Sequence, residues 1–136
     1  MELRVNDYVR TKNGHIGKII DINLGDIQTR YELDNSDEFH YEYKKDIIKS
    51  SPNIIDLIEE NDLVKIEYYA PGYEKRITRI FVVDFKNEND IAFENSHCNL
   101  NIFDNEWSKH DIKLNPVIKG IITHEQIESM EYKVKE

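Results

Sequence analysis

Residues 5–20 read VNDYVRTKNGHIGKII, and the fold prediction starts from this stretch. Segments rich in β-branched and aromatic residues lie on both sides of Asn13-Gly14. Asn-Gly is among the strongest signals for a β-hairpin, because both central positions of a type I′ turn need a positive φ. The stretch therefore predicts an entry strand, a tight turn at Asn13-Gly14 and a return strand that begins near Ile16.

The rest of the chain continues the β pattern. Phe39, Tyr41 and Tyr43 alternate with polar residues, which is the period of a half-buried strand. Further apolar runs bounded by Gly, Pro, Asn and Asp predict strands at 27–33, 63–69, 76–85, 91–93 and 117–122. The run at 76–85 is the longest of them and is predicted to be a central strand.

Residues 95–111 are mostly polar and predict no strand. The apolar side chains within this stretch are expected to dock on the core, and they are Leu100, Ile102, Phe103 and Trp107.

Helical signals are short and few. Ser51-Pro52 predicts one helical turn, with Ser51 as its cap and Ile54, Ile55, Leu57 and Ile58 packed inward. Residues 123–126 read THEQ, which is the S/T-x-x-E/Q capping box that opens a helix. We expect a short helix over 123–130 with Ile127 and Met130 facing the core.

The predicted fold class is mainly β, with SH3-like small barrels and a short C-terminal helix. Residues 1–50 are expected to form an SH3-like β unit and residues 51–136 a second β unit, packed as one body. An Asn-Asp pair followed by two apolar residues occurs at 6–9 and again at 61–64, which is a faint internal repeat. Whether the chain is one barrel with insertions or two fused barrels stays open at this point.

Composition and charge limit the function classes. The chain has 27 Asp and Glu residues against 18 Lys and Arg residues, and its formal net charge is −9. This charge opposes direct binding to nucleic acid, because phosphate backbones are repelled. It suits a partner with a basic groove, although the same charge also serves solubility alone.

The lone cysteine, Cys98, excludes an intrachain disulfide and indicates a cytoplasmic protein. The first twenty residues lack the pattern of a signal peptide, and no window resembles a membrane span. We expect no membrane association.

Catalytic and metal-binding motifs are lacking. His124-Glu125 starts like the H-E-x-x-H motif, but Glu128 stands where the second His is required. The remaining histidines lack ligand spacing, and close acidic pairs such as Asp104 and Glu106 arise by chance among 27 acids. The prediction is a non-enzyme with no cofactor, no catalytic residue and no metal site.

Two groups of residues are candidate binding sites. Acidic residues in predicted loops, with nearby tyrosines as aromatic anchors, would present phosphate-like charge to a partner, and they are Asp34, Asp37, Glu38, Glu59, Glu60, Asp62, Tyr69 and Tyr73. An alternative ligand site interleaves aromatic rings with cations at Tyr68, Tyr73, Lys75, Arg76 and Arg79. Ordinary solvated turns and a packed hairpin surface are the simpler explanations of the two groups.

The hairpin at residues 6–19 resembles that of an SH3-like, KOW-type small barrel, which pairs an entry strand, a Gly turn and a Gly-x-Ile return strand. Such barrels bind RNA, DNA, peptides or nothing, so this resemblance implies a fold and not a function.

As a whole, the chain resembles small uncharacterised phage and prophage proteins of low-GC Gram-positive bacteria. The segments that carry this resemblance are 7–14, 51–59 and 121–134. The resemblance implies a phage-encoded viral protein and supplies context only, because no activity is known for such proteins, although many small acidic phage proteins inhibit host defences. Together with the acidic loops and the lack of catalytic motifs, it leads us to expect a non-enzymatic protein in the host cytoplasm. This protein would inhibit a host defence or nucleic-acid-processing complex, in the manner of an anti-CRISPR protein, through acidic DNA mimicry. The alternatives are a nucleotide or nucleic-acid binding module acting as a ligand sponge, and a virion assembly protein.

Overall fold

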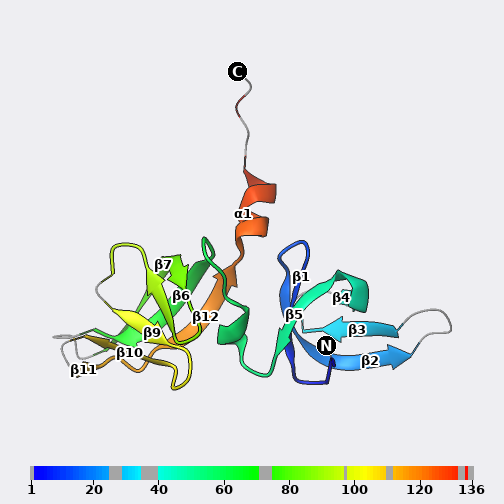
Figure 1. Cartoon of the computed structure of the whole chain (residues 1–136), viewed down its shortest axis with the longest axis horizontal. Coiled ribbons are helices and arrows are strands. Elements are labelled where there is room, and N and C mark those ends of the chain that lie inside the picture. Colours follow the sequence, from blue (N-terminus) through cyan, green and yellow to red (C-terminus); the bar gives the residue numbers. More distant parts are fainter. Residues whose placement is uncertain are drawn as a thin grey trace. The chain divides into compact units, whose positions relative to one another are not determined.

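The computed structural model describes residues 2–24, 29–34, 40–70, 75–96, 98–109, 112–131 and 134. The chain is mainly β and divides into two compact units, Met1–Leu57 (unit 1) and Ile58–Glu136 (unit 2) (Figure 1). Each unit is built on one antiparallel sheet, with five strands in unit 1 and seven in unit 2. The predicted fold class, mainly β with small barrel-like units and one short C-terminal helix, is confirmed.

Unit 1 contains β1 (Tyr8–Thr11), β2 (Ile16–Leu24), β3 (Thr29–Leu33), β4 (His40–Tyr43) and β5 (Ile47–Ser51) in the order β4-β3-β2-β1-β5. Two 3₁₀ turns, η1 (Lys44–Asp46) and η2 (Ile54–Leu57), flank β5. β5 returns to pair with β1, as in an SH3-like small barrel. The core is small and consists of Val9, Ile19, Tyr31, Leu33 and Ile47.

The predicted first hairpin is confirmed, but its turn type was wrong. The N–H of Gly14 donates to the carbonyl of Thr11 at 3.0 Å, and Gly14 has a φ of 85°. Asn13 is not among the described residues with positive φ, which a type I′ turn would require. The longer loop with a left-handed glycine at its end fits instead, and Gly14 supplies that conformation.

Unit 2 contains β6 (Leu63–Tyr69), β7 (Arg76–Lys86), β8 (Asp90–Phe93), β9 (Asn99–Asn101), β10 (Glu106–Lys109), β11 (Ile112–Lys113) and β12 (Val117–Ile122). Their order is β11-β10-β9-β8-β7-β6-β12, so β7 is a central strand as predicted. Within the described ranges, no helix has the length and apolar character that crossing a membrane requires.

The expectation of no strand at 95–111 was wrong, because β9 and β10 lie there. Leu100, Ile102 and Trp107 are buried as predicted, whereas the side chain of Phe103 is 79% exposed. Trp107 lies at the centre of an aromatic cluster. Its ring centroid is 4.6 Å from that of Tyr68 and 4.9 Å from that of Phe81, with edge-to-face geometry.

Unit 1 extends beyond the boundary predicted at residue 50, because η2 belongs to its body. The guanidinium of Arg10, buried in β1, donates to the carbonyl of Leu57 at 2.9 Å. Ser51 does not cap η2 directly, since the N–H of Ile55 bonds to the side chain of Asn53 at 3.2 Å. The predicted packing of the two units as one body stays a prediction.

The C-terminal helix, α1 (His124–Met130), has the predicted capping box. The Thr123 side chain accepts from the N–H of Gln126, and the Gln126 side chain accepts from the N–H of Thr123. The inward orientation predicted for Ile127 and Met130 was wrong, because these side chains are 37% and 80% exposed. The contact of α1 with the turn before β6 is made by its first residue, His124, and not by an apolar face.

The faint repeat in the sequence corresponds to a repeated backbone geometry. Asn6 and Asn61 both have positive φ, at 77° and 71°. The N–H of Asn6 donates to the carbonyl of Ile19 at 2.7 Å, and the N–H of Asn61 donates to the carbonyl of Val83 at 2.8 Å. In return, the N–H of Ile19 donates to the carbonyl of Asp7 at 2.8 Å, and the N–H of Val83 donates to the carbonyl of Asp62 at 2.9 Å.

Strand registers repeat as well. Tyr8 pairs with Ser51 in unit 1, and Leu63 pairs with Ile122 in unit 2. The β2–β3 ladder has a bulge after Ile19, and the β7–β8 ladder has one after Val83. The two units are therefore copies of one small five-stranded design, and unit 2 adds the strands β10 and β11 beside β9.

Candidate functional site

Strands β12, β6 and β7 present an outward surface, which we call the outer face. Val64, Ile66 and Tyr68 of β6 are buried, so the alternating residues of that strand point outward. Together with their neighbours on β7 and β12, the outward residues are Lys65, Glu67, Tyr69, Arg76, Thr78, Ile80, Val117 and Lys119.

Arg76 is the best-anchored side chain of the outer face. Its Nε donates to Glu67 Oε1 at 2.9 Å, and its Nη2 donates to the carbonyls of Glu67 at 2.9 Å and Asn115 at 2.6 Å. The guanidinium carbon lies 4.7 Å from the ring centroid of Tyr69. Arg76 and Tyr69 are thus held in fixed positions before any partner arrives.

Glu67 is stabilised in its charged form. The hydrogen bond from Arg76 is the main cause that lowers the pKa of this carboxyl, and Lys119 at 3.4 Å adds to the effect while partial burial opposes it. The centre of the outer face therefore carries a carboxylate between two cations.

The residues of the alternative ligand site do not converge. Tyr68 is buried against Trp107, while Arg76 points to the outer face and is already bound to three acceptors. Lys75 is exposed, and Tyr73 lies outside the described residues. Tyr68 and Arg79 instead line a cavity of about 230 Å³ together with Ile77, Phe81, Trp107 and Leu114. This volume is below the ~300 Å³ at which ligand pockets usually begin.

The predicted acidic set is dispersed. Asp34 is exposed in unit 1, where it accepts the N–H of Lys18 at 2.6 Å, and Glu60 is exposed in unit 2. Asp37 and Glu38 lie outside the described residues. Asp62 is fully buried, which corrects its assignment as a phosphate mimic: its two oxygens accept the N–H groups of Glu59 and His124 at 2.8 and 2.9 Å.

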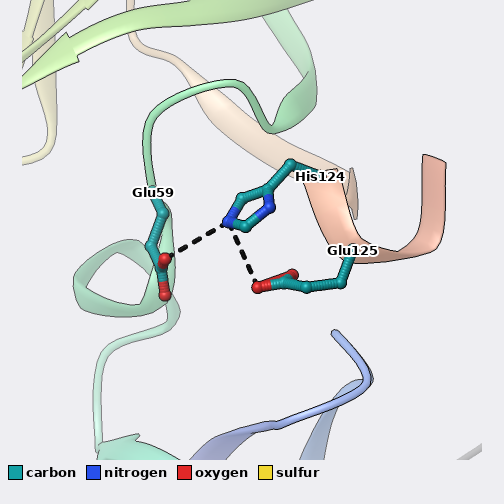
Figure 2. A group of neighbouring side chains, drawn as sticks. All are labelled: Glu59, His124 and Glu125. Atoms are coloured by element: carbon teal, nitrogen blue, oxygen red, sulfur yellow. Dashed lines mark hydrogen bonds and ion pairs between the residues drawn. The ribbon is translucent and has the colours of Figure 1, made fainter. Parts of the chain in front are cut away.

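Glu59 belongs to a cluster that the sequence did not reveal. The Nε2 atom of His124 lies 3.4 Å from Glu59 Oε1 and 3.1 Å from Glu125 Oε1 (Figure 2). The three side chains are 37%, 27% and 21% exposed for His124, Glu59 and Glu125, so each is accessible yet partly enclosed. Within the part of the chain that the structure describes, this is a group of metal-ligating side chains whose ligand atoms all lie within 4.8 Å of one another.

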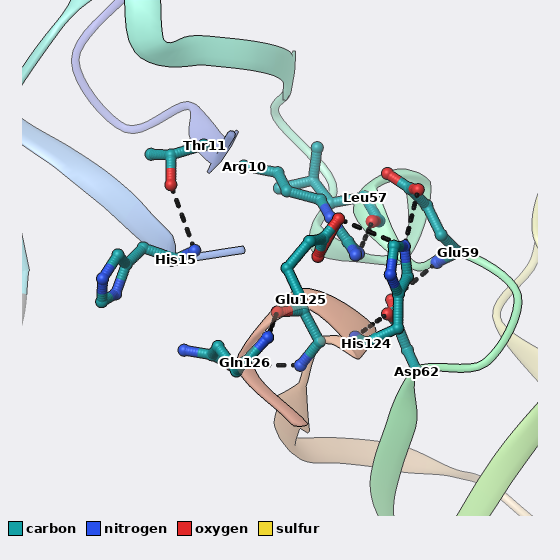
Figure 3. A network of polar contacts seen from close by, with 10 residues as sticks. Arg10, Thr11, His15, Leu57, Glu59, Asp62, His124, Glu125 and Gln126 are labelled. Atoms are coloured by element: carbon teal, nitrogen blue, oxygen red, sulfur yellow. Dashed lines mark hydrogen bonds and ion pairs between the residues drawn. The ribbon is translucent and has the colours of Figure 1, made fainter. Parts of the chain in front are cut away.

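Asp62 places the two halves of this cluster. It bonds to the backbone of both Glu59 and His124, as Figure 3 shows. His124 and Glu59 are 65 residues apart in the chain, so no local motif could indicate their contact. The signals that the sequence did contain were the capping box, which fixes the first turn of α1, and the Asn61-Asp62 turn.

Comparisons with known proteins found no match: no protein-family model, no curated protein and no solved structure is significantly similar to this chain.

Proposed function

We propose that this chain is a non-enzymatic protein-binding module and that the outer face of unit 2 is its docking surface. The observation that carries the proposal is the fixed Tyr69–Arg76 pair, which lies on a face that also exposes two apolar side chains. Ile80 is 62% exposed and Val117 is 45% exposed. Tyr and Arg are the residues that most often dominate interface energies, and a fixed anchor loses little entropy on binding.

The charge of the chain supports a partner with a basic surface. With a net charge of −9, the protein is attracted to a positively charged channel such as one that holds nucleic acid. Asp34, Glu59 and Glu60 are the described members of the acidic set that remain accessible. Our proposal is a phage-encoded inhibitor of a host defence or nucleic-acid-processing complex, acting in the host cytoplasm. The outer face carries more cations than carboxylates, so acidic mimicry of DNA, as the mode of action, is assigned to these accessible acids and not to the outer face.

Nucleotide capture has weaker support than protein binding. The guanidinium of Arg76 is already bound to three acceptors, and the Glu67 carboxylate beside it repels a phosphate. The cavity next to Arg79 is smaller than a nucleotide pocket. A virion assembly role has no specific observation in its favour.

The test begins with a tagged pull-down from the lysate of a defence-competent host, with and without nuclease, read by mass spectrometry. We expect a stoichiometric host protein that survives nuclease treatment. Its affinity is then measured for the wild type and for Ile80→Glu and Tyr69→Ala, which should weaken binding at least about tenfold if these side chains are central anchors.

Tyr41→Ala is the matched control. Tyr41 is an exposed strand tyrosine of unit 1, and Arg30 stacks on its ring at 5.1 Å, much as Arg76 stacks on Tyr69. We expect this variant to bind like the wild type. Equal losses in the unit 1 and unit 2 variants, or recovery of nucleotides only, would reject the outer face as the docking surface.

A further inference from the structure

The geometry points to a binding site for a divalent transition-metal ion of the Zn²⁺ type, with Glu59, His124 and Glu125 as its ligands. Imidazole nitrogen and carboxylate oxygen are both ligand types of this class of metal, and a site with three protein ligands leaves a fourth position open. The proposal does not rest on the outer face, since none of the three residues lies there, although Glu59 is also one of the accessible acids of the protein-binding proposal.

The distances between ligand atoms fit this assignment. Zn–N and Zn–O bonds of about 2.0 to 2.2 Å in tetrahedral geometry place neighbouring ligand atoms about 3.4 Å apart. His124 Nε2 lies 3.4 Å from Glu59 Oε1 and 3.1 Å from Glu125 Oε1 (Figure 2). The two separations from His124 are thus near the value that the ion requires, and the two carboxylate oxygens lie within 4.8 Å of each other.

The barrel design itself does not require these side chains. Unit 1 has the same turn before its first strand, in which the N–H of Asp7 bonds to Arg4 as the N–H of Asp62 bonds to Glu59. Arg4 therefore occupies the position of Glu59. After the last strand of unit 1, Asn53 and Ile54 stand where His124 and Glu125 stand after β12. At these described positions, the ligand set is present in unit 2 and absent from unit 1, on a backbone geometry that both units share.

The support around the ligands is also in place. Asp62 accepts the backbone N–H groups of Glu59 and His124 with its two oxygens, and this joins the two segments from which ligands project. The capping box between Thr123 and Gln126 fixes the first turn of α1, which carries the other two ligands. Such buried polar support is what orients metal ligands in proteins.

The ligand types determine which ions are selected. An imidazole nitrogen suits Zn²⁺, Co²⁺ and Ni²⁺, whereas Mg²⁺ and Ca²⁺ prefer sites made of oxygen alone. Cys98, the chain's lone thiol, lies between β8 and β9 and is not part of this group. We therefore expect Zn²⁺ to bind at one equivalent and Mg²⁺ not to compete.

Isothermal titration of the full chain with Zn²⁺ tests the proposal. The wild type should bind one equivalent, and His124→Ala, Glu59→Gln and Glu125→Gln should each weaken binding at least about tenfold through the loss of one ligand. Far-UV circular dichroism checks that each variant is folded, and the two Gln variants keep the shape of the side chains they replace.

His15→Ala is the control, because it removes a half-buried histidine of unit 1 that is outside the cluster. It should leave Zn²⁺ affinity unchanged. The proposal is overturned if His124→Ala binds Zn²⁺ as tightly as the wild type, if His15→Ala loses as much affinity as His124→Ala, or if Mg²⁺ displaces Zn²⁺ at equal concentration. A two-dimensional NMR titration gives a second readout, in which the His124 ring signals should shift before those of His15.

Discussion

Units 1 and 2 have the same strand registers but fill them with different side chains. Val9 in unit 1 pairs with Gly17, whereas the equivalent Val64 in unit 2 pairs with Phe81. A Cβ at Gly17 would lie 3.0 Å from the Cβ of Leu33, so unit 1 is closed tightly at this point. Phe81 instead packs against Trp107, with 4.9 Å between the ring centroids.

This comparison separates the features that the shared fold requires from the features that one unit has in addition. Both units keep an Asn with positive φ followed by an Asp, because that turn leads into the first strand of each sheet. Among the described residues, the aromatic cluster, the fixed Arg76 and the Glu59–His124–Glu125 group occur in unit 2 and not in unit 1. Features confined to one copy are the better candidates for function, since the shared backbone forms without them.

The largest effect expected from testing this comparison is at the shared Asp. Asp62→Ala leaves two backbone N–H groups without the buried carboxylate that accepts them, and should destabilise unit 2 by about 3 kcal/mol. Asp7→Ala removes one longer bond, 3.3 Å from the N–H of Arg4, and should cost unit 1 about 1 kcal/mol or less.

Urea denaturation can follow the two units separately. The chain has one Trp, which is Trp107 of unit 2, so its fluorescence reports on that unit, and far-UV circular dichroism reports on both. Asp62→Ala should shift the fluorescence midpoint far more than Asp7→Ala does. Equal shifts would show that Asp62 has no larger structural role than its counterpart in unit 1.

A smaller effect is expected from adding a methyl group at glycine. Gly17→Ala brings a Cβ within 3.0 to 3.1 Å of Leu33, which is buried in the core of unit 1, so we expect a loss of about 1 to 2 kcal/mol. Gly120→Ala in β12 meets no atom within 4 Å and should be neutral or stabilise unit 2 by about 0.5 kcal/mol. Thermal unfolding of both variants measures the difference in stability. If Gly17→Ala is as stable as the wild type, the space around Gly17 is as open as the space around Gly120.

Local patterns predicted most of the strands and the helix start. Asn13-Gly14, the run at 76–85 and the capping box at Thr123 depend on neighbours in sequence, and the structure contains the hairpin, β7 and α1 that they indicate. The strands β9 and β10 were missed because they are short and polar. They are held in the sheet by the pairing of Leu100 with Ile91 and with Trp107, and the ring of Trp107 packs on the distant Tyr68. Their apolar residues predicted burial without predicting the strand.

The candidate sites were less predictable, because a side chain's role depends on which face it occupies. Asp62 was predicted to be a surface acid because its side chain is charged. In the structure its carboxylate is buried and accepts two backbone N–H groups. The sequence analysis grouped Tyr68 with Arg76. In the sheet, Arg76 pairs with Tyr69, and the adjacent Tyr68 points to the opposite face. Glu59 and His124 meet only through the fold, so their contact was outside the reach of any spacing argument.

The smallest effect concerns the pH dependence that the outer face adds to unit 2. The hydrogen bond from Arg76 lowers the pKa of Glu67 from its ordinary value of 4.5, so the charged carboxylate is favoured in the folded state. Its stabilising contribution is complete above about pH 5 and is lost as pH falls through the lowered pKa. Because Gln cannot ionise, the Tm difference between the wild type and Glu67→Gln should be largest near neutral pH and should shrink below pH 4.

Glu2→Gln is the control for this measurement. It removes the ion pair of Glu2 with Arg4 in unit 1, whose side chains are 77% and 71% exposed. Exposed pairs are screened by water and salt, so this variant should unfold like the wild type across the same pH range. A Tm difference for Glu67→Gln that stays constant from pH 3 to pH 7 would contradict this prediction. It would mean that Glu67 contributes to stability through its shape and neutral hydrogen bonds, and not through its negative charge.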